Sequence, residues 1–183
     1  MKKRAISDKN DKKLILIVLR YIILLILVLN SYLIYKIFTP LTIYFSVIFL
    51  RLFYPVIFFG DQILINQTKI IEIIPSCVAG SAYVLLLILN LFVAMKPKQR
   101  IYSILFSFSL LFIFNILRIL VLSILFVNDF EYFYITHKLV WYVLSTLLVV
   151  GVWFLTIKIF KIKEVPVVSD IKCFIKNIKK SKK

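Results

Sequence analysis

Long apolar runs separated by basic clusters constrain this chain more than any other feature of its sequence. A helix needs about 20 apolar residues to cross a bilayer. Four runs reach or approach that length, at residues 14–38, 78–95, 101–127 and 138–160. Hydrophobic residues occupy 62% of the 183 positions, which is more apolar surface than a soluble domain of this length can bury. The sequence therefore predicts an all-α integral membrane protein with about four to five transmembrane helices.

A fifth apolar run, residues 41–59, contains Arg51 and ends at Gly60. The basic N-terminus and the basic loop at 96–100 should both be cytoplasmic, because positive loops stay inside. An even number of crossings must join them, and the runs 14–38 and 78–95 supply two. We therefore expect 41–59 to be a re-entrant or interfacial segment on the outer face, with Arg51 reaching the headgroups. The alternative is that this run spans the bilayer and the N-terminus lies outside.

The charge pattern divides the chain into three parts. Residues 1–13 form a basic cytoplasmic N-terminus, residues 14–160 a single transmembrane domain, and residues 161–183 a basic cytoplasmic tail. The formal net charge of +16 is concentrated in clusters that flank the apolar runs. This is the pattern of anchors that contact membrane lipids, and no nucleic-acid partner is expected. The first apolar run is too long for a signal peptide, so we expect it to be retained.

Residues 60–75, GDQILINQTKIIEIIP, differ from the apolar runs on either side. Isoleucine and leucine flank Asn66 and Gln67, which suit a turn between two strands. We expect a small β-hairpin on the outer face that leads the chain to Cys77. The cysteine would then stand at the start of the helix over 78–95.

An arginine and an asparagine lie close together inside the helix predicted for residues 101–127. An ionisable side chain inside a membrane segment is costly and is a functional candidate by default. Arg118 lies about nine residues, or roughly 13 Å, from the outer end of this run. Asn115 lies three residues earlier on the same helix face. The simpler interpretation is an arginine that reaches the headgroups or bonds a carbonyl.

Cysteine and histidine fall at the outer ends of two other predicted helices. Cys77 precedes the run 78–95, and unpaired N–H groups at a helix start lower a thiol pKa. Gly80 and Ser81 belong to a group of small residues that leave room for another helix or a substrate backbone. His137 is the only histidine and exchanges protons near neutral pH. Taken singly, these residues also suit an inert buried thiol and an ordinary interfacial histidine.

Together these side chains suit acyl transfer by a cysteine. The Cys77 thiolate would attack a carbonyl, His137 would activate the thiol and protonate the leaving amine, and Arg118 would stabilise the oxyanion. One histidine and few acidic residues cannot build a zinc site, and no phosphate-binding glycine motif occurs. Neither a metal nor a cofactor is therefore expected.

The motifs Cys77-Val78-Ala79-Gly80, Asn115-Ile116-Leu117-Arg118 and His137 follow one another in this order. In this order and spacing, residues 41–160 resemble the exosortase/archaeosortase family of membrane cysteine transpeptidases. The resemblance implies that residues 14–160 are a catalytic domain, with Cys77, Arg118 and His137 as catalytic residues. Asn115, Gly80 and Ser81 would bind substrate or support the site. Many members have Ser or Thr directly after the cysteine and carry more N-terminal helices than this chain.

The resemblance implies a multi-pass protein of the cell membrane with its active site on the extracytoplasmic face. Its substrates would be exported proteins with C-terminal sorting signals, each a short motif, an apolar helix and a basic cluster. After cleavage, the acyl group would pass to a lipid or glycan acceptor at the cell surface. The alternative is a non-enzymatic membrane assembly factor or small transporter, in which Arg118 and Asn115 join helices or contact a solute.

Overall fold

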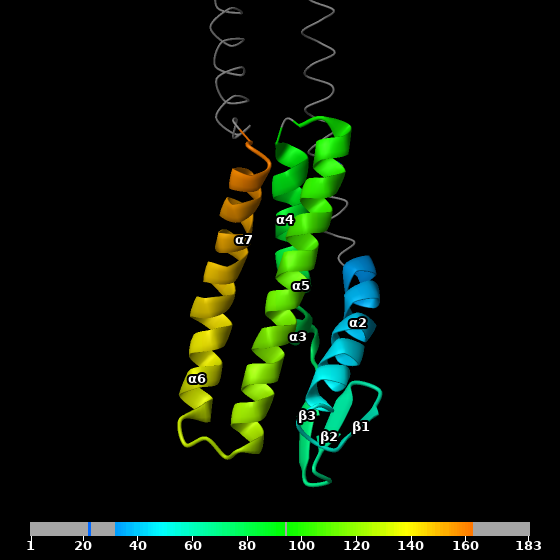
Figure 1. The fold of residues 1–183 in the computed structure, drawn as a ribbon, viewed down its shortest axis with the longest axis vertical. Helices are drawn as coiled ribbons and strands as arrows, with labels where there is room; N and C mark the ends of the chain where they lie inside the picture. The colour runs from blue at the N-terminus through cyan, green and yellow to red at the C-terminus, as the bar shows by residue number, and fades with distance from the viewer. Residues whose placement is uncertain (1–21, 23–31, 94, 163–183) are drawn as a thin grey trace, which may run out of the picture.

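The computed structural model describes residue 22, residues 32–93 and residues 95–162. Its long helices are α2 (Tyr32–Leu50), α4 (Gly80–Phe92), α5 (Pro97–Val127) and a continuous run of α6 (Phe133–Leu139), the π-helical turn η1 (Val140–Leu144) and α7 (Ser145–Ile159). In Figure 1 a small sheet and the α5–α6 loop lie at one end of the bundle, and the α4–α5 connection lies at the other. The predicted cytoplasmic segment 1–13 and nearly all of the tail 161–183 lie outside the described residues.

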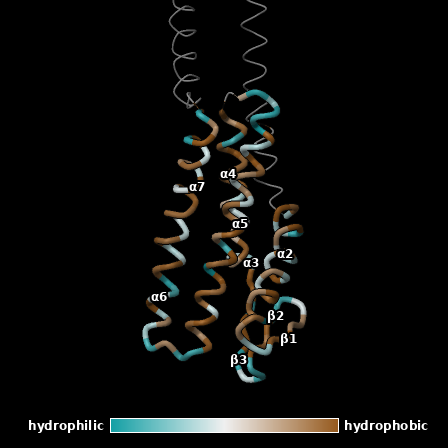
Figure 2. Tube along the Cα trace, in the orientation of Figure 1, coloured by the Kyte–Doolittle hydropathy of each residue, from teal (hydrophilic) through white to brown (hydrophobic). Residues whose placement is uncertain are grey.

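Among the residues that the structure describes, three helical segments are long and apolar enough to cross a membrane: Tyr32–Leu50, Pro97–Val127 and Phe133–Ile159. The helix α4 is also apolar but has only 13 residues. Apolar residues dominate along the helices, and polar residues gather at the α4–α5 connection and the α5–α6 loop (Figure 2). Many large hydrophobic side chains are exposed on the bundle surface, which suits contact with lipid rather than water. These features indicate a multi-pass membrane protein.

The expected boundary between a spanning helix at 14–38 and a separate segment at 41–59 is wrong. The helix α2 runs without interruption through Pro40 to Leu50, so it joins the two apolar runs. A proline inside a helix removes one backbone hydrogen bond, but apolar packing on both sides of it can hold the helix together. Arg51 lies exposed in the turn after α2. Residues 41–50 therefore form the second half of a candidate span instead of a re-entrant or interfacial segment.

The predicted hairpin is part of a three-stranded antiparallel sheet of order β1 (Val56–Phe59), β2 (Gln62–Ile65), β3 (Lys69–Glu72). Its β2–β3 turn holds Asn66 and Gln67 at φ 52° and 58°, as expected for a hairpin turn. The strand β1 was not predicted, because its sequence VIFF continues the apolar run without alternation. Ile63 and Ile65 are fully buried and belong to one core cluster with the end of α2.

The helix expected over 78–95 is shorter than predicted, and a separate helical turn precedes it. The short α3 (Pro75–Val78) ends at Ala79, which has a left-handed φ of 58°, and α4 begins at Gly80. Pro75 suits the start of α3, because its fixed φ is helical and its missing N–H would have no partner there. Cys77 therefore lies within a separate helical turn, which passes beside the middle of the bundle (Figure 1).

Buried polar side chains join α4 to α5. The Asn90 side-chain amide donates to the Leu86 carbonyl at 2.8 Å and to the Ser107 hydroxyl at 3.4 Å. The Ser103 hydroxyl donates to the Asn90 side-chain oxygen. Such hydrogen bonds fix neighbouring helices in a medium that offers no water.

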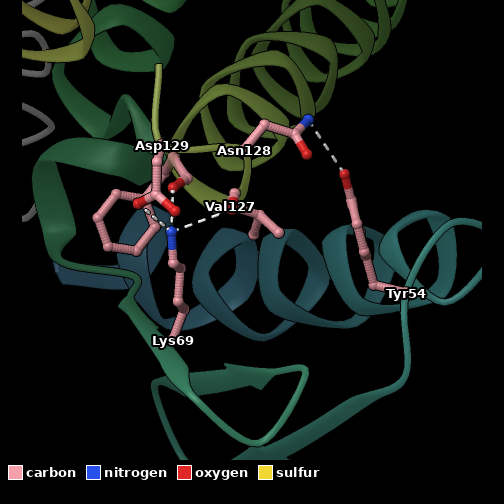
Figure 3. Close-up of polar contacts among 6 residues, drawn as sticks. Tyr54, Lys69, Val127, Asn128 and Asp129 are labelled. Atoms are coloured by element: carbon pink, nitrogen blue, oxygen red, sulfur yellow. Dashed lines mark hydrogen bonds and ion pairs between the residues drawn. The ribbon is translucent and has the colours of Figure 1, made fainter. Parts of the chain in front are cut away.

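At the sheet end, Lys69 of β3 caps the end of α5 (Figure 3). Its Nζ donates to the carbonyls of Phe126 at 3.1 Å and Val127 at 3.0 Å, and it pairs with Asp129. The last carbonyls of a helix have no partner inside the helix and carry the negative end of its dipole. Lys69 therefore holds β3 beside the end of α5.

Candidate active site

The backbone carbonyl of Cys77 accepts hydrogen bonds from two side chains of α5. Asn115 Nδ2 donates to it at 2.9 Å, and Arg118 Nη2 donates to it at 3.1 Å. Cys77 lies in a helix of only four residues, whose carbonyls lack partners of the usual intrahelical kind. The three-residue spacing of Asn115 and Arg118 places both on one face of α5, as expected. The structure therefore brings the predicted pair directly to the predicted cysteine.

Arg118 also bridges to the last helix. Its Nη1 donates to the Ser145 hydroxyl at 2.6 Å, and that hydroxyl donates to the Val140 carbonyl at 2.9 Å. A guanidinium presents its N–H groups in a rigid planar fork, so two acceptors on different elements fix its plane. Arg118 is thereby held between α3 and α7.

Ser145 was not identified from the sequence, and the π-helical turn explains why. In an uninterrupted α-helix, eight residues overshoot two full turns by roughly 80°, so His137 and Ser145 would point in different directions. The turn η1 absorbs one extra residue between them, which returns Ser145 to the face that carries His137. The spacing alone gave no signal of this, because π turns cannot be recognised from hydropathy.

Aromatic rings hold the His137 imidazole in place. The ring stacks on Phe133 with centroids 5.7 Å apart and an interplanar angle of 26°. It also meets the Trp141 ring edge-on, at 5.6 Å and 84°. All three residues lie one turn apart on the same face of the last helical run. Trp141 is a second residue of the site that sequence reasoning missed.

Cys77, Arg118 and His137 line one small cavity of about 30 Å³ between α3, α5 and α6. Ser76, Ile119, Leu122 and Trp141 complete its wall. This volume is close to the space that one water molecule occupies in the liquid. Among the described residues, no hydrogen bond joins the Cys77 thiol to the His137 imidazole. The three predicted catalytic residues therefore line a shared space without a hydrogen bond between thiol and imidazole.

Two larger cavities flank this one. The first, about 330 Å³, lies between α4, α5 and α7, and Ser81, Asn115, Arg118 and Ser145 are among its lining residues. The second, about 220 Å³, lies between β3, α5 and α6 and includes Cys77 and His137. The small cavity shares Arg118 with the first and Cys77 with the second. Cys77 itself lines the small cavity and the second of these larger cavities.

Gly80 does not line any of these three cavities. It is buried against the Tyr35 ring of α2, and a β-carbon added there would lie 2.4 Å from Tyr35 Cζ. Of the two roles expected for the small residues, Gly80 has the first, the close approach of another helix. Ser81 is exposed and faces the 330 Å³ cavity.

The Cys77 thiol departs from the expectation for a helix N-terminus. Burial raises its pKa above the ordinary cysteine value, and this effect outweighs the lowering by a backbone hydrogen bond at Ile74 and by the Arg118 charge. The expected net lowering is therefore wrong. The thiol needs a base to become a nucleophile at neutral pH, because burial disfavours its charged form.

A scan of the sequence against protein-family models finds no matching family, and searches of curated proteins and of solved structures find no match either. The class defined by the fold is thus a multi-pass helical membrane protein with a small antiparallel sheet at one end. Within that class, its distinguishing feature is a cavity shared by a cysteine, an arginine and a histidine.

Proposed function

We propose that this protein is a membrane-embedded cysteine protease or transpeptidase. It would cleave C-terminal sorting signals of exported proteins and transfer them to a cell-surface acceptor. The observation that carries the proposal is the meeting of Cys77, Arg118 and His137 at one cavity, from three separate elements. The substrate class and the lipid or glycan acceptor follow from the resemblance to exosortases and archaeosortases.

The reaction would proceed in two acyl transfers. The His137 imidazole takes the Cys77 proton, and the sulfur attacks the carbonyl carbon of the scissile peptide bond. The tetrahedral intermediate collapses to a thioester when the leaving amine accepts the proton from His137. An acceptor nucleophile then attacks the thioester, gives its proton to His137 and releases the thiol. With thiol and imidazole not bonded in the resting site, substrate binding would have to close this gap.

Arg118 is suited to stabilise the oxyanion of both intermediates. Its fork is already fixed by the Cys77 carbonyl and Ser145, so little reorganisation is needed when negative charge develops. Asn115 acts as a positioning residue, because it holds the backbone of the cysteine rather than the reacting atoms. Ser145 has the same role toward Arg118.

The basic residues support an extracytoplasmic site. Lys96, Lys98 and Arg100 lie at the α4–α5 connection, and Lys158 lies in the last turn of α7, at the same end of the bundle (Figure 1). Positive loops remain in the cytoplasm, so the sheet end would face outward. Arg118 lies nine residues from the outward end of α5, so the candidate site would be nearer the outer end of this helix than its inner end.

One observation favours a second candidate, a non-enzymatic membrane assembly factor. Asn115 and Arg118 both donate hydrogen bonds to the backbone carbonyl of Cys77, as polar residues do when their role is only to join helices. In that case the thiol would have no chemical role. The two candidates therefore differ in what the loss of the Cys77 sulfur does.

The deciding experiment replaces the sulfur and follows processing. In cells that express an exported reporter with a motif, an apolar helix and a basic tail, Cys77→Ala should leave the full-length reporter in the membrane. Cys77→Ser should be nearly as inactive, because a hydroxyl is a far weaker nucleophile. Cys173→Ala, at the other cysteine, is the matched control and should process normally. Normal processing by Cys77→Ala at wild-type protein levels would leave the assembly factor as the better candidate.

A further inference from the structure

A groove of about 220 Å³ follows the edge of β3 toward the candidate active site. Its lining includes the consecutive residues Ile70, Ile71, Glu72 and Ile73, as well as Cys77 and His137. Side chains of successive strand residues point to opposite faces of a sheet. A groove lined by four residues in a row therefore runs along the edge of the strand and not over one face.

The register shows which backbone groups point into this groove. The Ile73 N–H donates to the Asp61 carbonyl at 2.9 Å, and Ile71 is opposite Ile63. Since antiparallel pairs alternate between bonded and non-bonded, Ile71 and Ile73 direct their backbone groups to β2. Ile70 and Glu72 then direct theirs away from β2, on the side where the described sheet has no further strand. These N–H and C=O groups form an open strand edge.

The opposite wall of the groove is mostly apolar, and Ser123 is the polar residue that α5 contributes to it. It consists of residues from α5 and α6, among them Ile119, Leu122, Phe126 and Phe133. Lys69, directly before Ile70, bonds the end of α5 and so keeps the strand edge at a fixed distance from this wall. The groove thus offers backbone hydrogen bonds on one side and apolar contact on the other.

We propose that β3 binds an extended, largely apolar peptide segment as a fourth strand and that this strand delivers its carbonyl to Cys77. This inference rests on the proposed function. The groove and the small cavity share Cys77 and His137, so a strand bound along β3 leads to the thiol. A lipid acyl chain would satisfy the apolar wall but would leave the backbone groups of Ile70 and Glu72 unpaired, which is costly away from water. An added peptide strand would pair with the backbone groups of β3 and place apolar side chains against the opposite wall.

The test uses peptidyl electrophiles on the full chain, purified in detergent with Cys173→Ala so that Cys77 is the only thiol. The probe is acetyl-Val-Ala-Val-Ala chloromethyl ketone. The Cys77 sulfur bonds to its methylene carbon, chloride leaves, and the thiol proton passes to the imidazole or to water. Iodoacetamide, which has no peptide strand, reports the intrinsic reactivity of the thiol. The expected result is faster alkylation by the peptide than by iodoacetamide, after correction for their rates with free cysteine.

Single N-methylation along the probe tests for a strand. Each probe carries one N-methyl group, at a different amide. Because alternate amides of an added strand face β3, methylation of an amide that faces β3 should slow alkylation by roughly 3- to 10-fold, which corresponds to the free energy of one hydrogen bond. N-methylation at the positions between should change the rate much less. This pattern is measured on the wild-type groove, so it does not depend on the folding of any groove variant.

Ile70→Pro provides the reciprocal change in the protein. It removes an N–H that faces the groove without removing a bond to β2, and proline is tolerated on edge strands. Phe58→Pro is the matched control, because Phe58 occupies the corresponding outward position on β1, at the other edge of the sheet. Ile70→Pro should slow the peptide by a similar 3- to 10-fold and leave iodoacetamide unchanged. Phe58→Pro should slow neither reagent.

The outcomes separate the two proposals. If the N-methyl series shows no alternation, or Ile70→Pro alkylates like the wild type, strand addition is wrong and an occupant such as a lipid chain is indicated. The proposed function would survive that result, because Cys77 would still react and process substrate. If iodoacetamide fails to alkylate Cys77 at any pH up to 10, the nucleophile itself is absent and both proposals fail.

Discussion

At the scale of single residues, the fork geometry of Arg118 decides its role. One nitrogen bonds the Cys77 carbonyl and another bonds Ser145, on two different elements. A lysine ammonium has the charge but lacks the planar fork, so it cannot reproduce both contacts and still face the cavity. We expect Arg118→Lys to lower the processing rate by ~10²–10³, as does the loss of one oxyanion donor.

The measurement is the fraction of reporter processed over time in cells. Arg100→Lys is the matched control, because Arg100 donates a side-chain hydrogen bond to the Val93 carbonyl at 3.0 Å and lies near the start of α5, 18 residues before Arg118. Processing at the wild-type rate by Arg118→Lys would reduce Arg118 to a structural link between helices.

A second prediction at this scale concerns the pH dependence of the thiol. Burial raises the pKa of Cys77, so the thiolate forms, and alkylation accelerates, at a pH above the roughly 8.5 of an ordinary cysteine. The positive charge of Arg118 opposes this shift, so Arg118→Gln should move the midpoint to still higher pH. The rate of iodoacetamide alkylation from pH 6 to 10, in the Cys173→Ala background, measures both midpoints. A midpoint below that of free cysteine would show that the charge outweighs burial.

At the scale of elements, the contact of α4 with α2 depends on the absence of a side chain at Gly80. A methyl group there would overlap the Tyr35 ring, with 2.4 Å to its nearest carbon. We expect Gly80→Ala to destabilise the bundle by about 1–3 kcal/mol, as is usual for overpacking. The measurement is the thermal unfolding midpoint in detergent.

Gly151→Ala serves as the matched control for this change. A β-carbon at Gly151 in α7 would meet nothing within 4 Å. The substitution should therefore raise stability slightly, through the better helix propensity of alanine. If both variants shift the unfolding midpoint alike, the close contact between Gly80 and Tyr35 does not contribute to stability.

The elements also show what the sequence could predict and what it could not. Hydropathy and length predicted α5 well, because long apolar runs leave a chain few options in lipid. The break at Ala79 was missed, since alanine has no preference for a left-handed φ and the surrounding contacts impose it. The strand β1 and the helix through Pro40 were missed because an apolar run alone does not distinguish strand, helix and loop.

The residues of the candidate site were easier to single out from the sequence than the elements that carry them. Cysteine and histidine are rare in this chain, and Arg118 is a charged residue inside an apolar run, so Cys77, Arg118 and His137 were conspicuous before any contact was known. Ser145 and Trp141 are not conspicuous, and their part in the site depends on a helical phase that only the structure gives. The hydrogen bond from Asn115 to the Cys77 carbonyl was likewise beyond prediction from spacing.

At the scale of the whole molecule, the proposed orientation in the membrane would put the two cysteines on opposite sides. The groove at the sheet end gives a small reagent access to Cys77, whereas Cys173 follows the basic end of α7 in sequence. A charged, impermeant methanethiosulfonate added to intact cells should label Cys77 and not Cys173. Permeabilised cells, where Cys173 should become reactive, are the control. Labelling of Cys173 alone in intact cells would show that the orientation is the reverse of the one proposed.

The π-helical turn at Val140–Leu144 has a consequence for how this chain should be compared with others. The π-helical turn adds one residue to the last helix. The regular 3.6-residue spacing of side chains therefore does not continue from the residues before the turn to the residues after it. A homologue with an unbroken α-helix could keep the counterparts of His137 and Ser145 on one face with one residue fewer between them. The correct alignment of two such chains would then place a single-residue gap inside a hydrophobic helix, where gaps are normally penalised. Two chains with the same residues on the same helix face would then receive a low alignment score, because only one of them has the π-helical turn.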